Sequence, residues 1–323
     1  MTRIVNNCVA LVCLCLFWGQ SLRAADASHS EQIKWGNESV FNEEHNTLGL
    51  FSGVLGGQIV LAGGTSDDYS RWGRNAVCLS ENAGFALYED VLSKPLAYGA
   101  SITLSDGILC IGGRDSSQCY KDVFLVTMQQ GKLNVSEDWP PLPFPLSNAA
   151  GALLDNKVYL FGGRKSVSPS RLSDSFFVLD LSNKSRGWKE LPGYPGCVRE
   201  DAILVVQNNG VSPCLYLLGG QTETEEWLSS CLTDGYVYNP QLGKWSSLGS
   251  DFPKGICAAV ASGANHILLF QKEPEDTQHL KKENALWKYH TITQTLVKSE
   301  CIPGTYDTCL LYTSDAADDS LRV

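Results

Sequence analysis

Short runs of apolar, strand-forming residues alternate with polar turn signals along most of this chain. The pattern is clearest around Asp155-Asn156-Lys157, where Asp and Asn supply residues that tolerate the left-handed backbone of a hairpin turn. Small apolar residues precede the turn at Gly151–Leu154, and the wholly apolar run Val158–Phe161 follows it. Gly162-Gly163 then ends the run. The stretch therefore predicts two antiparallel strands joined by a tight turn.

The same unit, an apolar run that ends in two glycines, recurs along the chain. The four glycine pairs are Gly63-Gly64, Gly112-Gly113, Gly162-Gly163 and Gly219-Gly220, and their first glycines are 49, 50 and 57 residues apart. A fifth apolar run, His266–Phe270, is followed by Gln271-Lys272 in place of the glycines. Repetition of strand-like segments at about 50 residues predicts an all-β fold, a kelch-type β-propeller.

Each repeat also predicts a third strand rich in aromatic residues and an outermost strand that starts with tryptophan. The third strands are Val123–Val126, Phe176–Leu179, Tyr236–Tyr238 and Leu286–Tyr289, whose rings we expect to pack between blades. The outermost strands are Trp139–Pro143, Trp188–Pro192 and Trp245–Leu248. Gln32–Trp35 is also a short strand-like segment with a tryptophan, so the chain is expected to start with the last strand of a blade. Such an arrangement pairs the two ends of the chain in one blade and removes a free sheet edge.

The N-terminus has the features of a targeting segment. Arg3 precedes an apolar run, Val9–Trp18, and Ala25-Asp26-Ala27 resembles a cleavage site. The run is too short to cross a bilayer. Residues 1–27 therefore predict a signal peptide, and the mature protein is expected to be soluble, with no membrane attachment, and periplasmic or secreted.

Composition narrows the classes of partner and chemistry. The chain is 43% hydrophobic and 19% charged, which suits a sizeable core, and its net charge of −10 argues against nucleic acid and anionic membranes as partners. No phosphate-binding glycine loop, zinc-protease motif or hydrolase serine motif is present. The five histidines are scattered along the chain: His29, His45, His266, His279 and His290. We therefore expect no cofactor and no metal.

The twelve cysteines leave disulfide pairing open. Cys8, Cys13 and Cys15 lie in the predicted signal peptide and Cys309 lies near the C-terminus. The other eight allow more pairings than a sequence can choose among. Cys110 sits inside an apolar strand, where a buried free thiol is expected.

Several stretches resemble the cyclically permuted mutarotase family, relatives of N-acetylneuraminate epimerase. They are Leu96–Ser101, Asn148–Leu153, Gly187–Pro192, Thr233–Pro240 and Gly243–Trp245, within a resemblance that covers roughly Gly53–Pro303. The resemblance implies a six-bladed propeller, of which residues 28–308 hold about five blades and part of a sixth. It also implies an isomerase that interconverts the α and β anomers of a small sugar acid, free sialic acid, without a cofactor.

Opening of a sugar ring needs a base for the anomeric hydroxyl and an acid for the ring oxygen. An arginine suits the sugar's carboxylate, because its planar fork matches two oxygens. In a propeller the starts of the inner strands and the nearby loops line the central funnel, and here those positions hold Tyr98, Asn148 and Arg199-Glu200-Asp201.

The candidate substrate-binding residues are Arg199, Tyr98, Asn148 and Glu200. Arg199 follows Pro-Gly-Cys-Val, which is similar to a Pro-Gly-x-x-Arg arrangement of the family, and is the predicted carboxylate contact. The alternatives are a solvated loop arginine, and backbone hydrogen bonding by Tyr98 and Asn148. Arg114 and Arg164 follow glycine pairs and could face the funnel or solvent.

The chain also departs from the family pattern. The resemblance places the family's catalytic glutamate and arginine in a Gly-Glu-x-Lys-Pro-Gly-x-Arg motif in the last blade, which has no match here, so catalytic residues stay unassigned. The loop Thr65–Gly73 is shorter than in the family. Residues 309–323 resemble a translated sequencing adapter, so we expect the last blade to be incomplete and two sheet edges to be exposed, with poor stability.

Two functions follow from these observations. The stretches that resemble the mutarotase family and the predicted signal peptide favour a sialic acid mutarotase. The lost glycines, the shortened loop and the missing motif favour a non-catalytic kelch propeller that binds a glycan or a protein partner. The sequence leaves the exact sugar and the oligomeric state open, with a homodimer as one option.

Overall fold

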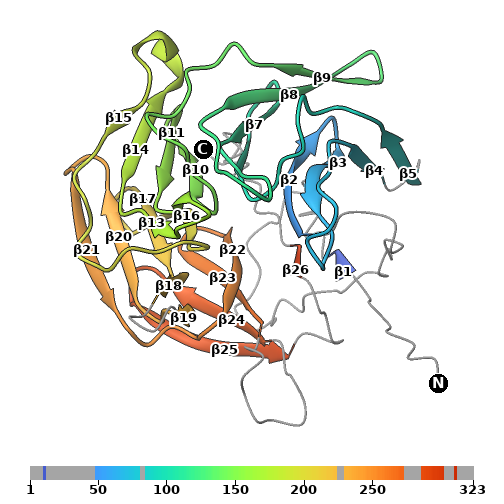
Figure 1. Ribbon diagram of the computed structural model, residues 1–323. Coiled ribbons are helices and arrows are strands. Elements are labelled where there is room, and N and C mark those ends of the chain that lie inside the picture. Colours follow the sequence, from blue (N-terminus) through green and yellow to red (C-terminus); the bar gives the residue numbers. More distant parts are fainter. Residues whose placement is uncertain are drawn as a thin grey trace.

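The structure, a computed structural model, describes residues 10–11, 48–80, 84–223, 229–272, 285–301 and 309–310. Apart from one 3₁₀ helix, the regular elements of these residues are all β-strands (Figure 1). The predicted signal peptide, the predicted strand Gln32–Trp35 and the predicted adapter-like tail lie outside the described residues, apart from two short strands. Those predictions therefore stay predictions.

Five four-stranded antiparallel sheets contain most of the strands of the described chain. The first contains β2 (Leu48–Leu55), β3 (Gln58–Thr65), β4 (Ala76–Ser80) and β5 (Gly84–Tyr88). The second contains β6 (Ala100–Thr103), β7 (Ile108–Ile111), β8 (Val123–Gln129) and β9 (Lys132–Ser136). The third contains β10 (Ala150–Leu154), β11 (Lys157–Phe161), β14 (Phe176–Asp180) and β15 (Lys189–Glu190).

The fourth sheet contains β16 (Ile203–Asn208), β17 (Pro213–Leu218), β20 (Gly235–Asn239) and β21 (Lys244–Gly249). The fifth contains β22 (Ile256–Ser262), β23 (His266–Gln271), β24 (Ala285–His290) and β25 (Thr295–Cys301). Within every sheet the strands pair in chain order. The predicted hairpin is confirmed, because Leu154 pairs with Lys157 across a turn in which Asp155 and Asn156 have left-handed backbones.

Smaller elements extend this framework. Two hairpins follow the third and fourth glycine pairs, namely β12 (Arg164–Ser166) with β13 (Arg171–Leu172) and β18 (Gln221–Glu223) with β19 (Ser229–Cys231). A 3₁₀ helix, η1 (Leu181–Arg186), links β14 to β15. The strands β1 (Ala10–Leu11) and β26 (Cys309–Leu310) pair in parallel. In the described part of the chain, no helix has the length and apolar character needed to cross a membrane.

The five sheets are arranged around a common centre, with the first strand of each innermost and the fourth outermost (Figure 1). The inner strands of neighbouring sheets contact one another in the order β2, β6, β10, β16 and β22. The described residues thus form five blades of a β-propeller, which confirms the predicted all-β, kelch-type fold. The predicted partial sixth blade falls on residues outside the described ranges.

The hydrophobic core lies between adjacent blades. One buried cluster joins Phe51 and Val60 of the first sheet to Ile108 and Phe124 of the second, and the rings of Phe51 and Phe124 meet edge to face at 5.5 Å. Similar clusters join each later sheet to the next. The predicted packing of third-strand aromatics between blades is therefore confirmed, and burial of such rings is a main source of stability.

One predicted outermost strand is wrong. The outermost strand of the second sheet is β9, whereas Trp139–Pro143 forms no strand. The Gln130-Gly131 turn, with both residues left-handed, returns the chain directly from β8 into β9. Pro140, Pro141 and Pro143 lack the N–H donors that a strand needs. The other two predictions hold, because β15 lies within Trp188–Pro192 and β21 spans Trp245–Leu248.

Seven cysteines whose side chains the structure describes carry free thiols: Cys78, Cys110, Cys119, Cys197, Cys214, Cys231 and Cys257. Cys110 is only 1% exposed, which confirms the predicted buried thiol. Burial also raises the pKa of that thiol well above its usual range, so it stays protonated. It acts as a small apolar side chain in the core between the first two blades.

The glycine pairs mark the places where one blade meets the start of the next. All eight glycines have positive φ. In the first three pairs the N–H of the second glycine donates across the blade boundary, from Gly64 to Leu96 O at 2.8 Å, from Gly113 to Leu146 O at 2.8 Å and from Gly163 to Arg199 O at 2.9 Å. A Cβ at Gly112 would lie 2.2 Å from Leu146 O. Glycine is needed there for both its backbone freedom and its lack of a side chain.

The fifth repeat shows how the missing glycines are replaced. Gln271 continues β23 by pairing with Ile256, and its side-chain amide donates to Lys254 O at 3.1 Å. Its carbonyl oxygen accepts from Trp287 Nε1 at 2.7 Å. The side chain of Gln271 thus supplies contacts of its own at the position where the other repeats have a glycine.

We expect Gly112→Ala to lower the free energy of unfolding by about 3 kcal/mol or more, because it combines a left-handed alanine with a clash against backbone. Gly131→Ala in the same blade is the control, since its φ is +73° and nothing lies within 4 Å of the added Cβ. The control should lose only about 1 kcal/mol. Urea unfolding measures both values. Equal losses in the two variants would contradict the proposed role of the blade boundary.

Candidate functional site

Three residues at the starts of inner strands occupy equivalent places in successive blades. Tyr98, Asn148 and Asp201 each lie two residues before the inner strand, and their φ angles are 59°, 55° and 51°. Main-chain hydrogen bonds join them in series: Asn148 N donates to Tyr98 O at 2.7 Å, and Asp201 N donates to Asn148 O at 3.0 Å. Tyr98 N donates in turn to Gly49 O at 2.7 Å, in the first blade. This series places the three residues side by side at the central end of their blades.

Asp201 carries the most strongly perturbed carboxyl group at this centre. The residue as a whole is exposed, but protein atoms crowd its carboxyl group, and this desolvation raises the pKa of that group to about 6. The Asn148 amide opposes the rise by donating to Asp201 Oδ1 at 2.9 Å. The Glu200 carboxylate adds to the rise, and the Arg164 and Arg114 charges oppose it. A carboxyl group in this state exchanges protons near neutral pH.

Arg164 is held by acidic side chains from the next blade. Its Nε donates to Glu200 Oε2 at 2.8 Å, and its Nη2 lies 3.1 Å from Glu223 Oε1. Its Nη1 donates to Ser170, whose hydroxyl donates to Glu223. The hydrogen bond to Glu200 raises the pKa of Arg164, which therefore stays charged. Its guanidinium is already bound by these neighbouring side chains.

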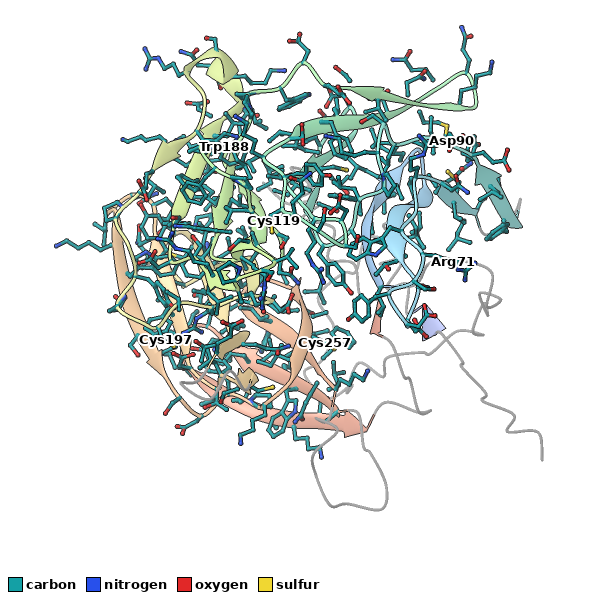
Figure 2. All side chains as sticks on the ribbon, viewed as in Figure 1. Arg71, Asp90, Cys119, Trp188, Cys197 and Cys257 are labelled. Carbon is teal, nitrogen blue, oxygen red and sulfur yellow. The ribbon has the colours of Figure 1, made fainter. Side chains whose placement is uncertain are left out.

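Arg114 follows the second glycine pair, just as Arg164 follows the third, but its surroundings are aromatic. Its guanidinium carbon lies 4.6 Å from the centre of the Tyr98 ring and 5.2 Å from the Trp72 ring. Its backbone pairs with Ala97 and with Cys119. Figure 2 shows Cys119 near the centre of the ring of blades. Arg114 therefore lies at the inner part of the second blade.

These six residues from the second, third and fourth blades form what we call the funnel group: Tyr98, Arg114, Asn148, Arg164, Glu200 and Asp201. The structure brings together three of the four predicted substrate-binding residues, namely Tyr98, Asn148 and Glu200. The sequence predicts Asp201 only as a funnel position, and leaves open whether Arg114 and Arg164 face the funnel or solvent. The repeat register could have found all three, because Asp201 aligns with Tyr98 and Asn148, and both arginines directly follow glycine pairs.

The fourth predicted residue, Arg199, lies in the wall between blades. Its side chain is fully buried, and its Nη1 and Nη2 donate to Asp234 at 2.7 and 2.8 Å. Its Nη1 also donates to Gly219 O at 2.8 Å, and its Nε donates to Tyr194 Oη at 2.9 Å. Arg199 is therefore not a solvated loop arginine. A contact with a substrate carboxylate stays a prediction for this residue.

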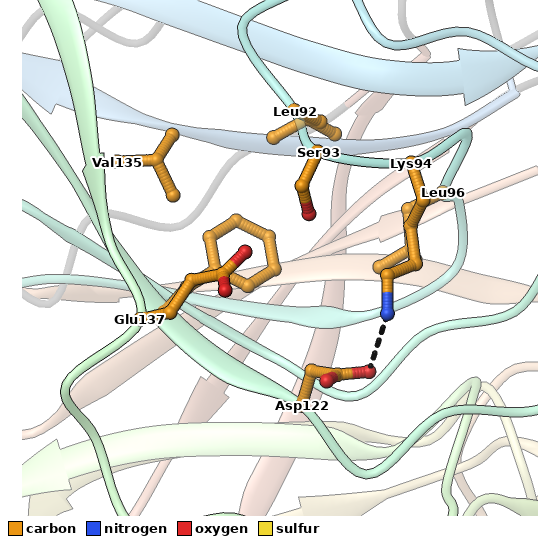
Figure 3. Close-up of a pocket in the computed structure, with 8 residues that line it drawn as sticks. Leu92, Ser93, Lys94, Leu96, Asp122, Val135 and Glu137 are labelled. Atoms are coloured by element: carbon orange, nitrogen blue, oxygen red, sulfur yellow. Dashed lines mark hydrogen bonds and ion pairs between the residues drawn. The ribbon is translucent and has the colours of Figure 1, made fainter.

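A separate hollow lies beside the link between the first and second blades (Figure 3). It has an empty volume of about 290 Å³, part of it open solvent, and its lining shares no residue with the funnel group. Lys94 Nζ lies 3.2 Å from Asp122 Oδ2 and 4.5 Å from the centre of the Tyr120 ring. The one cation among the described residues of its lining is thus paired with Asp122, so we place the chemistry at the funnel group instead. No cluster of three or more potential metal ligands is found among the described side chains.

We expect Arg199→Met to lower the free energy of unfolding at pH 7 by about 3–5 kcal/mol, because it leaves the Asp234 carboxylate partly buried and unpaired. Arg74→Met is the matched control. It breaks an ion pair with Asp90 whose side chains are 40% and 68% exposed, so it should cost at most about 1 kcal/mol. Urea unfolding distinguishes the two. A loss in Arg199→Met no larger than in the control would show that the buried pair does not stabilise the fold.

The same pair predicts a pH dependence. Burial alone would raise the pKa of Asp234, but hydrogen bonds and charge from Arg199 outweigh it and hold that pKa below its usual value. The resulting stability is complete above the pKa of an unfolded aspartate, about 4, and is lost as the pH falls through the lower folded value. Unfolding measured between pH 7 and pH 3 should therefore show a smaller acid loss in Asp234→Asn than in the unsubstituted chain.

Comparison with known proteins gives a consistent family signal over part of the chain. The family model described as N-acetylneuraminate epimerase matches residues 139–273. An N-acetylneuraminate epimerase of Yersinia pestis (strain Pestoides F) is 30% identical over 139 residues, which cover 42% of this chain and 33% of that protein. One of Haemophilus influenzae (strain PittEE) is 30% identical over 131 residues, 41% of this chain and 32% of that protein.

A kelch domain-containing protein of Vibrio cholerae serotype O1 is 30% identical over 141 residues, 43% of this chain and 36% of that protein. The chain thus spans about a third of the length of the curated relatives it matches. The matched segment contains Asn148, Arg164, Glu200 and Asp201 of the funnel group, whereas Tyr98 and Arg114 precede it. The resemblance predicted from the sequence is confirmed, and residues 139–273 are similar to the N-acetylneuraminate epimerase family.

Proposed function

We propose that this chain is a sugar-acid isomerase of the N-acetylneuraminate epimerase type, which interconverts the α and β anomers of N-acetylneuraminate at the funnel group. The observation that carries the proposal is Asp201, an exposed residue at the central end of the blades whose carboxyl group has a pKa of about 6. The similarity of residues 139–273 to the epimerase family supports the choice of substrate class.

The reaction needs only proton transfer. Asp201, as a carboxylate, takes the proton of the anomeric hydroxyl while a water molecule protonates the ring oxygen. The bond between the anomeric carbon and the ring oxygen breaks, and a carbonyl group forms. Rotation about the adjacent bond then turns the other face of the carbonyl group toward the ring-forming hydroxyl. On reclosure that hydroxyl attacks the carbonyl carbon and gives its proton back to the hydroxide left by the water, while protonated Asp201 gives its proton to the carbonyl oxygen, which yields the other anomer. A base with a pKa close to the working pH is the most effective for such steps.

The neighbours of Asp201 suit this role. Asn148 donates to Oδ1 of Asp201 and fixes its orientation, which leaves Oδ2 for the sugar hydroxyl. Glu200 is bound to Arg164, whose positive charge offsets part of the effect of the Glu200 carboxylate on Asp201. These contacts let Asp201 ionise near neutral pH rather than well above or below it.

The signal-peptide features of residues 1–27 support a periplasmic or secreted location as part of the same proposal. Free sugar acid would then reach the funnel outside the cytoplasm.

We expect Asp201→Asn to slow the relaxation of an enriched N-acetylneuraminate anomer by about 10²- to 10⁴-fold, because asparagine cannot accept the proton. Proton NMR follows the relaxation to equilibrium. Asp155→Asn is the control, since Asp155 lies in the turn between β10 and β11 and should keep the full rate. A full rate in Asp201→Asn would rule out Asp201 as the base.

The rate should also rise with pH through an apparent pKa of about 6, because the ionised form of Asp201 is the base. The Asp201→Asn variant should lack this dependence. If the unsubstituted chain binds N-acetylneuraminate but does not speed its relaxation, the isomerase proposal fails and a non-catalytic glycan-binding propeller replaces it.

A further inference from the structure

We propose that Arg114 is the residue that binds the carboxylate of the sugar acid, an inference that rests on the function proposed above for the same site. Arg114 is distinguished from the other central arginines by its lack of a carboxylate partner among the described residues, by its aromatic contacts and by its place relative to Asp201.

The arginines near the centre differ in the side chains that contact their guanidinium groups. Arg164 is bound by Glu200 and Glu223, and Arg199 is bound by Asp234. Among the described residues, Arg114 contacts the faces of two aromatic rings and has no carboxylate partner in an ion pair. A half-buried guanidinium in this situation has hydrogen-bond donors available for an anion.

The aromatic contacts also orient the guanidinium. Its carbon lies over the Tyr98 ring at 4.6 Å and over the Trp72 ring at 5.2 Å, and the two rings are inclined at 60°. Trp72 is itself held, because its Nε1 donates to Tyr69 O at 3.1 Å. A cation–π contact with a ring provides no conventional hydrogen-bond acceptor, so the N–H groups of Arg114 can still donate to two carboxylate oxygens. The site is therefore oriented before any ligand arrives, which lowers the cost of binding.

Arg114 and Asp201 also face the same central region. The main chain of Tyr98, whose ring supports Arg114, bonds to Asn148, which bonds to Asp201 through both its main chain and its side chain. The positive charge of Arg114 acts on the Asp201 carboxyl and lowers its pKa, as a nearby cation must. In N-acetylneuraminate the carboxylate and the anomeric hydroxyl share one carbon atom. A carboxylate receptor and a base that serve this sugar must accordingly lie close together.

This arrangement makes Arg114 a specificity-determining residue. A sugar acid supplies the negative charge that the guanidinium lacks, whereas a neutral sugar of the same shape leaves those donors without a charged partner. The chain should therefore discriminate between N-acetylneuraminate and its methyl ester, which differ only at the carboxylate.

The test measures the affinity of the full chain for N-acetylneuraminate and for its methyl ester by calorimetric titration. The unsubstituted chain should bind the acid about 10- to 100-fold more tightly than the ester, as expected for charge-assisted hydrogen bonds. Arg114→Gln should lose that preference and leave the ester affinity unchanged. Arg114→Lys keeps the charge but loses the planar fork, so it should fall between the two.

Arg186→Gln is the matched control, because Arg186 is an exposed arginine in η1 beside the outermost strand β15. It should bind both ligands as the unsubstituted chain does. Circular dichroism establishes that each variant is folded, and Arg114→Lys carries the test if Arg114→Gln does not fold.

The outcomes separate this inference from the proposed function. If the chain speeds anomer relaxation but folded Arg114 variants keep the preference for the acid, the isomerase stands and the role of Arg114 is overturned. If the preference is lost as expected but no relaxation is catalysed, Arg114 is the carboxylate receptor and the isomerase fails. If the unsubstituted chain binds acid and ester equally, or binds neither, the role of Arg114 is also overturned.

Discussion

Main-chain hydrogen bonds between blades, made just before the inner strands begin, hold the centre of this molecule together. Each runs from the start of one inner strand to the start of the preceding one, as from Asp201 to Asn148 and from Asn148 to Tyr98. The residues that make them have left-handed backbones, and the glycine pairs of the neighbouring strands approach the same segments closely. Any side chain at these positions is therefore delivered to the centre by the backbone itself.

The placement of the funnel group follows from this constraint. Tyr98, Asn148 and Asp201 differ in chemistry but share one backbone position, so they lie next to one another although about 50 residues separate them in the chain. The residues after the glycine pairs, Arg114 and Arg164, flank them because each pairs with the residue just before that position. A repeat fold can thus gather different side chains at one site while each blade keeps the same core.

Of the three arginines described near the centre, two pair with carboxylates of the protein and the third does not. Arg199 stabilises the wall through Asp234, and Arg164 compensates Glu200 and Glu223, so both serve the protein's own carboxylates. Arg114 rests on aromatic rings instead. In a chain with a net charge of −10, one cation supported in this way is enough to make a local site for an anion, because the surrounding acidic surface is screened over about 8–10 Å at physiological salt.

The sequence alone determined the repeat, the hairpin around Asp155, the glycine pairs and the aromatic strands, because these depend on local backbone preference and on the period of apolar residues. It also pointed to the inner-strand starts as the funnel. It could not show that Arg199 is buried against Asp234 while Arg114 is not, since both are arginines near a glycine-rich boundary, and their partners are distant in the chain. Nor could it place the outermost strand of the second blade at β9, which depends on where the turn after β8 closes. Those outcomes required the tertiary structure, because burial and ion pairing are set by which blades face each other.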